Sequence, residues 1–116
     1  MVVEWLEKGG HVDALDDENK RGLLHAAANG GHLCVAKELL KRGASVDLRG
    51  AKDDTSLMGA AVMDQPGMVR LLLKHKASVD LQDGDGETAL MAAADEGHTE
   101  CVKELLAAGA STELRD

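Results

Sequence analysis

The sequence of this 116-residue chain predicts an all-α solenoid built from stacked helix–turn–helix units. The first observation behind this prediction is a period of 33 residues, at which the segments 24–32 and 43–48 each recur twice. The second is the composition, which is 44% hydrophobic but includes one Trp and neither Phe nor Tyr. Small apolar side chains favour thin layers of closely packed helices over one thick core.

The third copy of the repeat shows how one unit is expected to fold. The segment 83–87 is rich in Asp and Gly and predicts a turn. Thr88 has the side chain of an N-cap, so a short helix is expected at about 89–95, ended by Gly97 in the left-handed conformation. Apolar residues at helical spacing predict a second helix at about 99–108. Three such copies predict six helices in three antiparallel pairs, without an extended sheet.

This unit has a specific motif. Its pattern is Asp-x-x-Gly-x-Thr-x-Leu-x-x-Ala-Ala-x-x-Gly-His from Asp83 to His98, followed by Leu-Leu-x-x-Gly-Ala from Leu105 to Ala110. With its 33-residue period, the pattern resembles the ankyrin repeat over essentially the whole chain. The resemblance implies β-hairpin-like fingers beside a row of inner helices, which together form a concave surface that binds partner proteins.

The repeat register divides the chain as a single array. A part-repeat at 1–15, with a short helix at 2–8, precedes full repeats at 16–48, 49–81 and 82–114. Residues 115–116 align with the start of a further finger. This frame favours a piece of a longer array, and a natural short protein is the alternative.

The chain departs from the family pattern where the first helix of each repeat begins. The first full repeat has His25 but Gly22 in the usual Thr position, and the other two have Thr but carry Met58 and Met91 in the His position. Because a capping hydrogen bond contributes ~1 kcal/mol, we expect these hairpins to be held less tightly.

The middle repeat departs most from the pattern. Asp64 replaces the helix-ending Gly, Gln65 replaces His, and Asp53 replaces the finger Gly. Pro66 stands where the first turn of the next helix accepts a proline ring. We therefore expect the fold to survive with this repeat as its weak point.

The net charge of −8 excludes the function classes that need clustered Lys and Arg, so no nucleic acid and no anionic membrane surface is expected as a partner. No apolar run is long enough to cross a membrane, and the acidic residues near the N-terminus argue against a signal peptide. We expect an intracellular, cytoplasmic protein. Its two thiols, Cys34 and Cys101, are two repeats apart, ~20 Å, and should stay unbridged.

No residue pattern predicts catalysis, a metal site or a cofactor. No two of the five histidines form a metal-binding pair, and His32 and His98 occupy the place where the family uses imidazole to bind loop backbone. The segment 84–86 lacks the Lys and the strand of a phosphate loop and the ligand spacing of a calcium loop. The chain is therefore not expected to be an enzyme.

The function that this resemblance implies is a protein-interaction module or scaffold segment. The expected contact positions are residues of the fingers and of the loops after the inner helices: Asp16, Glu18, Asn19, Arg21, Asn29, Gly30, Arg49, Ala51, Lys52, Asp54, Val62, Met63, Gln82, Gly84, Asp85, Glu87, Asp95 and Glu96. The alternative is a structural spacer with no ligand of its own, because this surface has few apolar residues of the kind that dominate binding.

Charge gives a further expectation about the partner. Between residues 77 and 102 there are seven acids and neither Lys nor Arg. This run is either a solvated acidic surface or a patch that steers a basic partner.

The unlike ends of the array predict a monomer in dilute solution with end-to-end stacking at high concentration.

Overall fold

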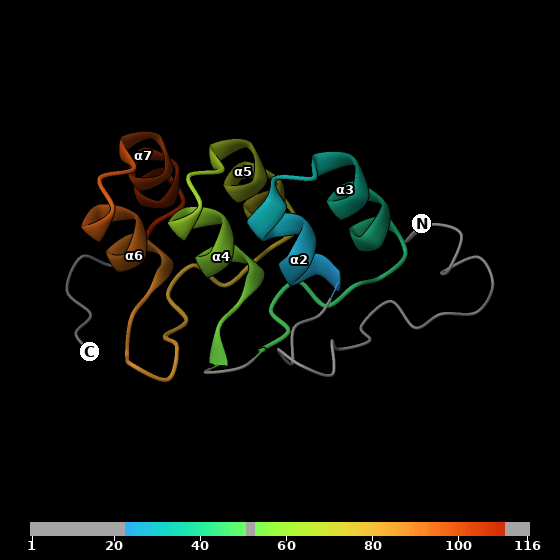
Figure 1. Ribbon diagram of the computed structural model, residues 1–116, viewed down its shortest axis with the longest axis horizontal. Helices are drawn as coiled ribbons and strands as arrows, with labels where there is room; N and C mark the ends of the chain where they lie inside the picture. The colour runs from blue at the N-terminus through green and yellow to red at the C-terminus, as the bar shows by residue number, and fades with distance from the viewer. Residues whose placement is uncertain (1–22, 51–52, 111–116) are drawn as a thin grey trace.

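The computed structural model describes residues 23–50 and 53–110, and the expected helix at 2–8 lies outside them. These described residues form six helices and no strand, which confirms the predicted class. In chain order the helices are α2 (Leu23–Gly30), α3 (Leu33–Lys41), α4 (Ser56–Val62), α5 (Pro66–Lys74), α6 (Ala89–Asp95) and α7 (Thr99–Ala107). Helices α2, α4 and α6 form one row and α3, α5 and α7 form a second row above it (Figure 1).

Local side-chain chemistry explains where α4 and α6 begin. The hydroxyl of Thr88 accepts a hydrogen bond from the backbone N–H of Met91 at 3.2 Å, as predicted for an N-cap. Thr55 caps α4 in the same way, and the sulfur of Met58 in turn accepts a weak bond from the Thr55 N–H at 3.4 Å. Methionine in the family's His position therefore still closes a reciprocal cap around the start of α4.

The His of the first repeat makes a contact of a different kind. His25 is buried in α2, and its Nε2 lies 3.0 Å from the backbone oxygen of Asp54, in the finger of the next repeat. This hydrogen bond joins two neighbouring repeats. It holds α2 against the second finger.

The core lies between the two rows of helices and between successive repeats. Three leucines 33 residues apart, Leu39, Leu72 and Leu105, are completely buried on the outer helices. On the inner helices the buried positions are mostly alanine, as at Ala27, Ala60 and Ala93. Because alanine adds little bulk, the inner helices can pack closely without large aromatic side chains.

Every described non-glycine residue with a positive φ falls in the middle repeat, at Asp53, Asp64 and Lys76, with φ of 59°, 55° and 70°. At each of these places the neighbouring described repeat has glycine, for example Gly109 (φ 90°) in the place of Lys76. L-amino acids other than Gly adopt this conformation at a cost. Backbone strain therefore concentrates in the middle repeat, where the sequence predicts a weak point.

This distribution yields a stability prediction. We expect Lys76→Gly to raise the free energy of unfolding by about 0.5–1 kcal/mol, because glycine removes the left-handed strain after α5. The converse change, Gly43→Lys in the first repeat, should lower it by a similar amount, since a Cβ there meets no atom within 4 Å and only backbone strain changes. Urea unfolding of the two variants measures both effects, and a destabilised Lys76→Gly protein would contradict this account.

The fingers extend from the lower row of helices, away from the upper row (Figure 1). In the third finger the N–H of Asp83 donates to the oxygen of Glu87 at 2.9 Å, and Gly86 turns the chain with φ 82°. In the second finger the N–H of Gly50 donates to the oxygen of Asp54 at 2.9 Å. The third finger is thus a tight, hairpin-like turn, and the described ends of the second finger are joined by a hydrogen bond.

Candidate functional site

Three loops that follow the inner helices form one row across the array. The residues are Asn29 and Gly30 at the end of α2, Val62 and Met63 at the end of α4, and Asp95 and Glu96 at the end of α6. Because the pairs are 33 residues apart in stacked repeats, they occupy equivalent places along the array. The structure thereby brings together six of the positions that sequence reasoning selected.

These loops differ in chemistry from one repeat to the next. Asn29 is half-buried, whereas Val62 and Met63 are 41% and 52% exposed. Asp95 and Glu96 are both exposed. The row therefore runs from a neutral polar pair through an apolar pair to an acidic pair.

The finger residues divide into those that hold the fingers and those that face solvent. Arg49 is half-buried, and its Nη1 donates to the backbone oxygens of Asp53 at 2.8 Å and Gln82 at 2.6 Å, which ties the second finger to the third. The side-chain amide of Gln82 donates to the oxygen of Gly86 at 2.8 Å. In the described residues, Arg49 and Gln82 therefore form hydrogen bonds that stabilise the fingers. The sequence predicted only a role in binding for these two residues.

Asp83 organises the tip of the third finger. One carboxylate oxygen of Asp83 accepts the backbone N–H groups of Asp85 and Glu87, both at 2.9 Å. This arrangement leaves Asp85 exposed at the tip and Glu87 half-buried. In the second finger Asp54 is half-buried, and one of its carboxylate oxygens is buried without a hydrogen-bond partner in the described structure.

Five expected contact residues, and Ala51 with them, lie outside the described parts of the chain: Asp16, Glu18, Asn19, Arg21 and Lys52. Their role stays a prediction from the resemblance. The described surface of the candidate site is therefore that of the second and third repeats and of the loop after α2.

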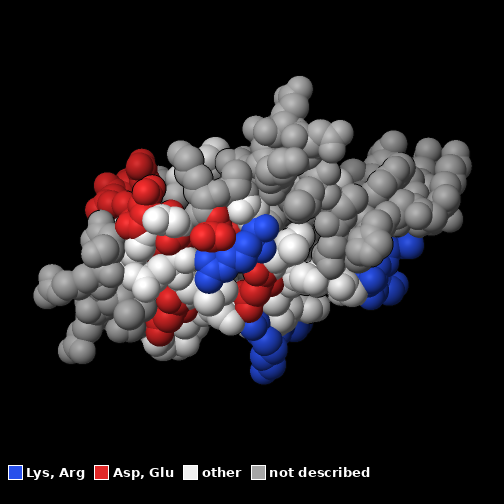
Figure 2. All heavy atoms as spheres, turned by 90° about the horizontal axis from the view of Figure 1, so that it is seen from below, with Lys and Arg blue, Asp and Glu red and all other residues white. Residues whose placement is uncertain are grey.

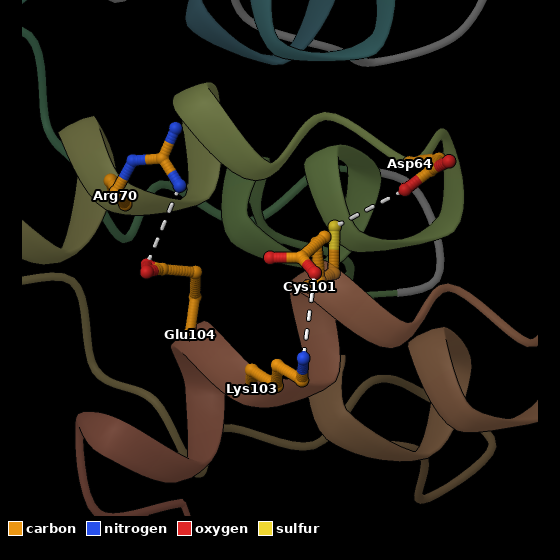
Figure 3. A network of polar contacts seen from close by, with 6 residues as sticks. Asp64, Arg70, Cys101, Lys103 and Glu104 are labelled. Atoms are coloured by element: carbon orange, nitrogen blue, oxygen red, sulfur yellow. Dashed lines mark hydrogen bonds and ion pairs between the residues drawn. The ribbon is translucent and has the colours of Figure 1, made fainter.

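A cluster between the second and third repeats was missed by sequence reasoning. His98, ahead of α7, has Nε2 3.0 Å from the backbone oxygen of Val62, which confirms its predicted role in binding loop backbone. Its Nδ1 lies 3.7 Å from a carboxylate oxygen of Asp64. The other carboxylate oxygen of Asp64 lies 3.8 Å from the sulfur of Cys101 (Figure 3). Asp64 is strained in its left-handed conformation, and the third repeat supplies partners for its charge.

The repeat register contained a signal for this cluster. Gly31 and Gly97 occupy the place of Asp64 in the other repeats, so only the middle repeat has a carboxylate at this position. A second cross-repeat pair, Arg70 with Glu104 at 3.6 Å, lies beside it (Figure 3). Because Arg70 is largely exposed, that ion pair contributes little stability.

The pKa of the Cys101 thiol in α7 is clearly shifted. Burial raises the pKa of its thiol from 9.0 to about 11, and the negative charge and hydrogen bonding of Asp64 act in the same direction. Cys34 in α3 is exposed, and both thiols are free in the structure. The thiol of Cys101 is therefore held in its neutral form at physiological pH.

Charge is unevenly distributed on the side that carries the fingers. Seen from that side, acidic side chains gather toward the end of the third repeat and also flank the Lys and Arg in the middle, and further Lys and Arg lie toward the other end (Figure 2). Within the described residues, no group of three or more His, Cys, Asp or Glu could hold a metal ion. No described helix has the length and apolar character needed to cross a membrane.

Comparison with known proteins agrees with this geometry. A family model for ankyrin repeats (3 copies) matches residues 1–83 and 23–116, which together span the whole chain. This chain belongs to the ankyrin-repeat family. Ankyrin repeats are in general protein-interaction modules.

The ankyrin array also resembles part of a larger protein. It is 44% identical over 57 residues to the integrin-linked protein kinase homolog pat-4 of Caenorhabditis elegans. The match covers 49% of this chain and 12% of that relative. The chain thus spans a small part of the relative's length. The word kinase in the relative's name describes that protein.

Proposed function

We propose that this chain is a non-catalytic protein-interaction module that binds a partner with a basic surface through its third finger and the loops after its inner helices. The observation that supports this proposal is the acidic, exposed set formed by Asp85, Asp95 and Glu96. No Lys or Arg occurs in the sequence from residue 77 to 102. Fields of one sign raise the rate at which oppositely charged partners associate.

The family relationship supports a binding role in general, and the charge defines the kind of partner. The same relationship makes an intracellular protein the natural context for this array. The alternative is a structural spacer without a ligand. In that case the surface formed by the third finger and the loops after the inner helices would stay exposed to solvent while the protein performs its function. The two functions differ in whether its charges affect capture of any other protein.

Charge-neutral variants test the proposal. In a pull-down from the cells that express the protein, the triple variant Asp85→Asn, Asp95→Asn, Glu96→Gln is expected to lose the proteins that the unaltered chain captures. Capture by the unaltered chain should also weaken as salt increases, because exposed charges are screened.

A control with the same change in net charge is available on the outer helices. Glu38 in α3 and Glu100 and Glu104 in α7 lie away from the fingers, and their triple change to Gln should leave capture intact. Equal loss in both variants would show that net charge alone matters. Unchanged capture by the finger and loop variant would overturn the proposal, and no specific capture by the unaltered chain would favour the spacer.

A further inference from the structure

An apolar pair is exposed in the middle of the loop row. The described structure has four exposed large hydrophobic side chains, and two of them, Val62 and Met63, are adjacent at the C-terminal end of α4. The other two, Leu33 and Leu106, are on the outer helices. Repeats on either side have polar residues or glycine at the places of Val62 and Met63, so the fold itself does not require apolar side chains there.

The backbone that carries this pair is fixed from two directions. The N–H of Met63 donates to the oxygen of Gly59 at 3.0 Å, which continues the bonding of α4. The imidazole of His98, from the third repeat, binds the oxygen of Val62 at 3.0 Å. The apolar side chains are thus presented on an ordered loop, and less conformational entropy is lost when a partner binds them.

The charge beside this pair changes in one direction along the row. Asp95 and Glu96 lie one repeat further toward the C-terminal end and are exposed. Asn29 and Gly30 lie one repeat the other way and are uncharged. A complementary partner would place an apolar group on the pair Val62 and Met63 and a cation on the pair Asp95 and Glu96.

The spacing of the repeats selects the conformation of such a partner. Packed helices are about 8–10 Å apart, so equivalent loops of successive repeats are separated by about that distance. Seven residues of an α-helix rise about 10.5 Å, and residues i and i+7 lie on nearly the same face. In an extended strand, side chains of one face recur every ~6.7 Å, so successive ones fall short of or beyond the next loop.

We propose that the partner presents an amphipathic helix, with an apolar residue on Val62 and Met63 and a Lys or Arg seven residues away on Asp95 and Glu96. This inference rests on the proposed function and names the chemistry of the partner for the same surface. The helix lies along the loop row, so its register on the array is set by the apolar contact and its direction by the acidic pair. If the partner helix bound in the opposite direction, its Lys or Arg would lie at the uncharged loop after α2 and would have no acidic partner.

Peptides of defined spacing test this proposal on the full chain. Alanine-rich helical peptides about 18 residues long carry one Leu and one Arg, separated by seven residues in one peptide and by five in a control of identical composition. Five residues place the two side chains on opposite faces of a helix. Fluorescence anisotropy is expected to show at least ~10-fold tighter binding of the seven-residue spacing, a difference of about 1.4 kcal/mol.

Variants of the chain locate the bound peptide. The double change Val62→Asn, Met63→Gln should weaken binding of the seven-residue peptide at least ~10-fold, and Asp95→Asn, Glu96→Gln should weaken it and reduce its salt dependence. Leu106→Asn, which alters a side chain of similar exposure on α7, is the matched control and should have no effect. Far-ultraviolet circular dichroism confirms that each variant keeps its helical fold.

The outcomes separate this inference from the proposed function. Equal affinity for the two spacings, no binding of either peptide, or equal loss with Leu106→Asn would overturn the helical partner. If the acid-neutral triple variant still loses captured proteins in those cases, binding by the acidic surface stands and only the partner's conformation is wrong.

Discussion

Replacing Leu72 by alanine is expected to lower the free energy of unfolding by about 3 kcal/mol. The Leu72 side chain is completely buried in α5, the outer helix of the middle repeat. A buried Leu→Ala change removes apolar contacts and leaves a cavity, at a typical cost of about 2–5 kcal/mol. Small arrays have little stability to lose, so this change should shift the urea midpoint strongly or abolish the folded state.

The position of Leu72 in the middle of the array adds a specific expectation. Leu105 is its equivalent in α7 and is also fully buried. Within the described residues, α5 packs between α3 and α7, whereas α7 packs against α5 on one side. In a linear array, weakening the middle repeat breaks two interfaces, so Leu72→Ala should be more harmful than Leu105→Ala. A similar or smaller loss for Leu72→Ala would contradict the layered description, and the exposed Lys74→Ala serves as the surface control.

A thiol reagent at pH 8 is expected to modify Cys34 quickly and Cys101 at least ~100-fold more slowly. The thiolate is the reactive form, and raising the pKa of Cys101 from 9.0 to about 11 lowers its thiolate fraction about a hundredfold. Complete burial of Cys101 slows the reaction further, while Cys34 is exposed. Mass spectrometry of the partly labelled protein identifies which thiol has reacted.

Two controls connect this contrast to the fold. In urea both thiols should react at similar rates, because unfolding removes the burial. Asp64→Asn should speed modification of Cys101 in the native protein, since the charge of Asp64 is the second cause of the raised pKa. Equal rates for the two native thiols would show that Cys101 is accessible and that the packing of α7 described above is wrong.

The same pKa rise has a consequence for stability at alkaline pH. The unfolded thiol ionises near pH 9.0 and the folded one near pH 11, so the neutral thiol's contribution is complete below pH 9 and is lost as pH rises through about 11. Unfolding should therefore become easier over this interval by an amount that Cys101→Ala does not show. Parallel pH series of the two proteins isolate the effect from other titrating groups.

The sequence by itself determined the features that depend on neighbouring residues. The repeat register predicted six helices, and the helix expected at about 89–95 is α6, with Thr88 as its N-cap. Pro66 occupies the first residue of α5, as its ring geometry predicts. Caps, proline positions and left-handed turns are decided within a few residues, so a single repeat contains the information for them.

Only the tertiary structure decided how the repeats meet. Arg49 was expected at the binding surface, yet its guanidinium joins two fingers, and Asp64 was expected only as a strained substitute for glycine, yet it faces His98 and Cys101 of the next repeat. Such contacts depend on the distance and rotation between stacked units. These are set by the packing of whole helices, so a pattern read within one repeat does not contain them.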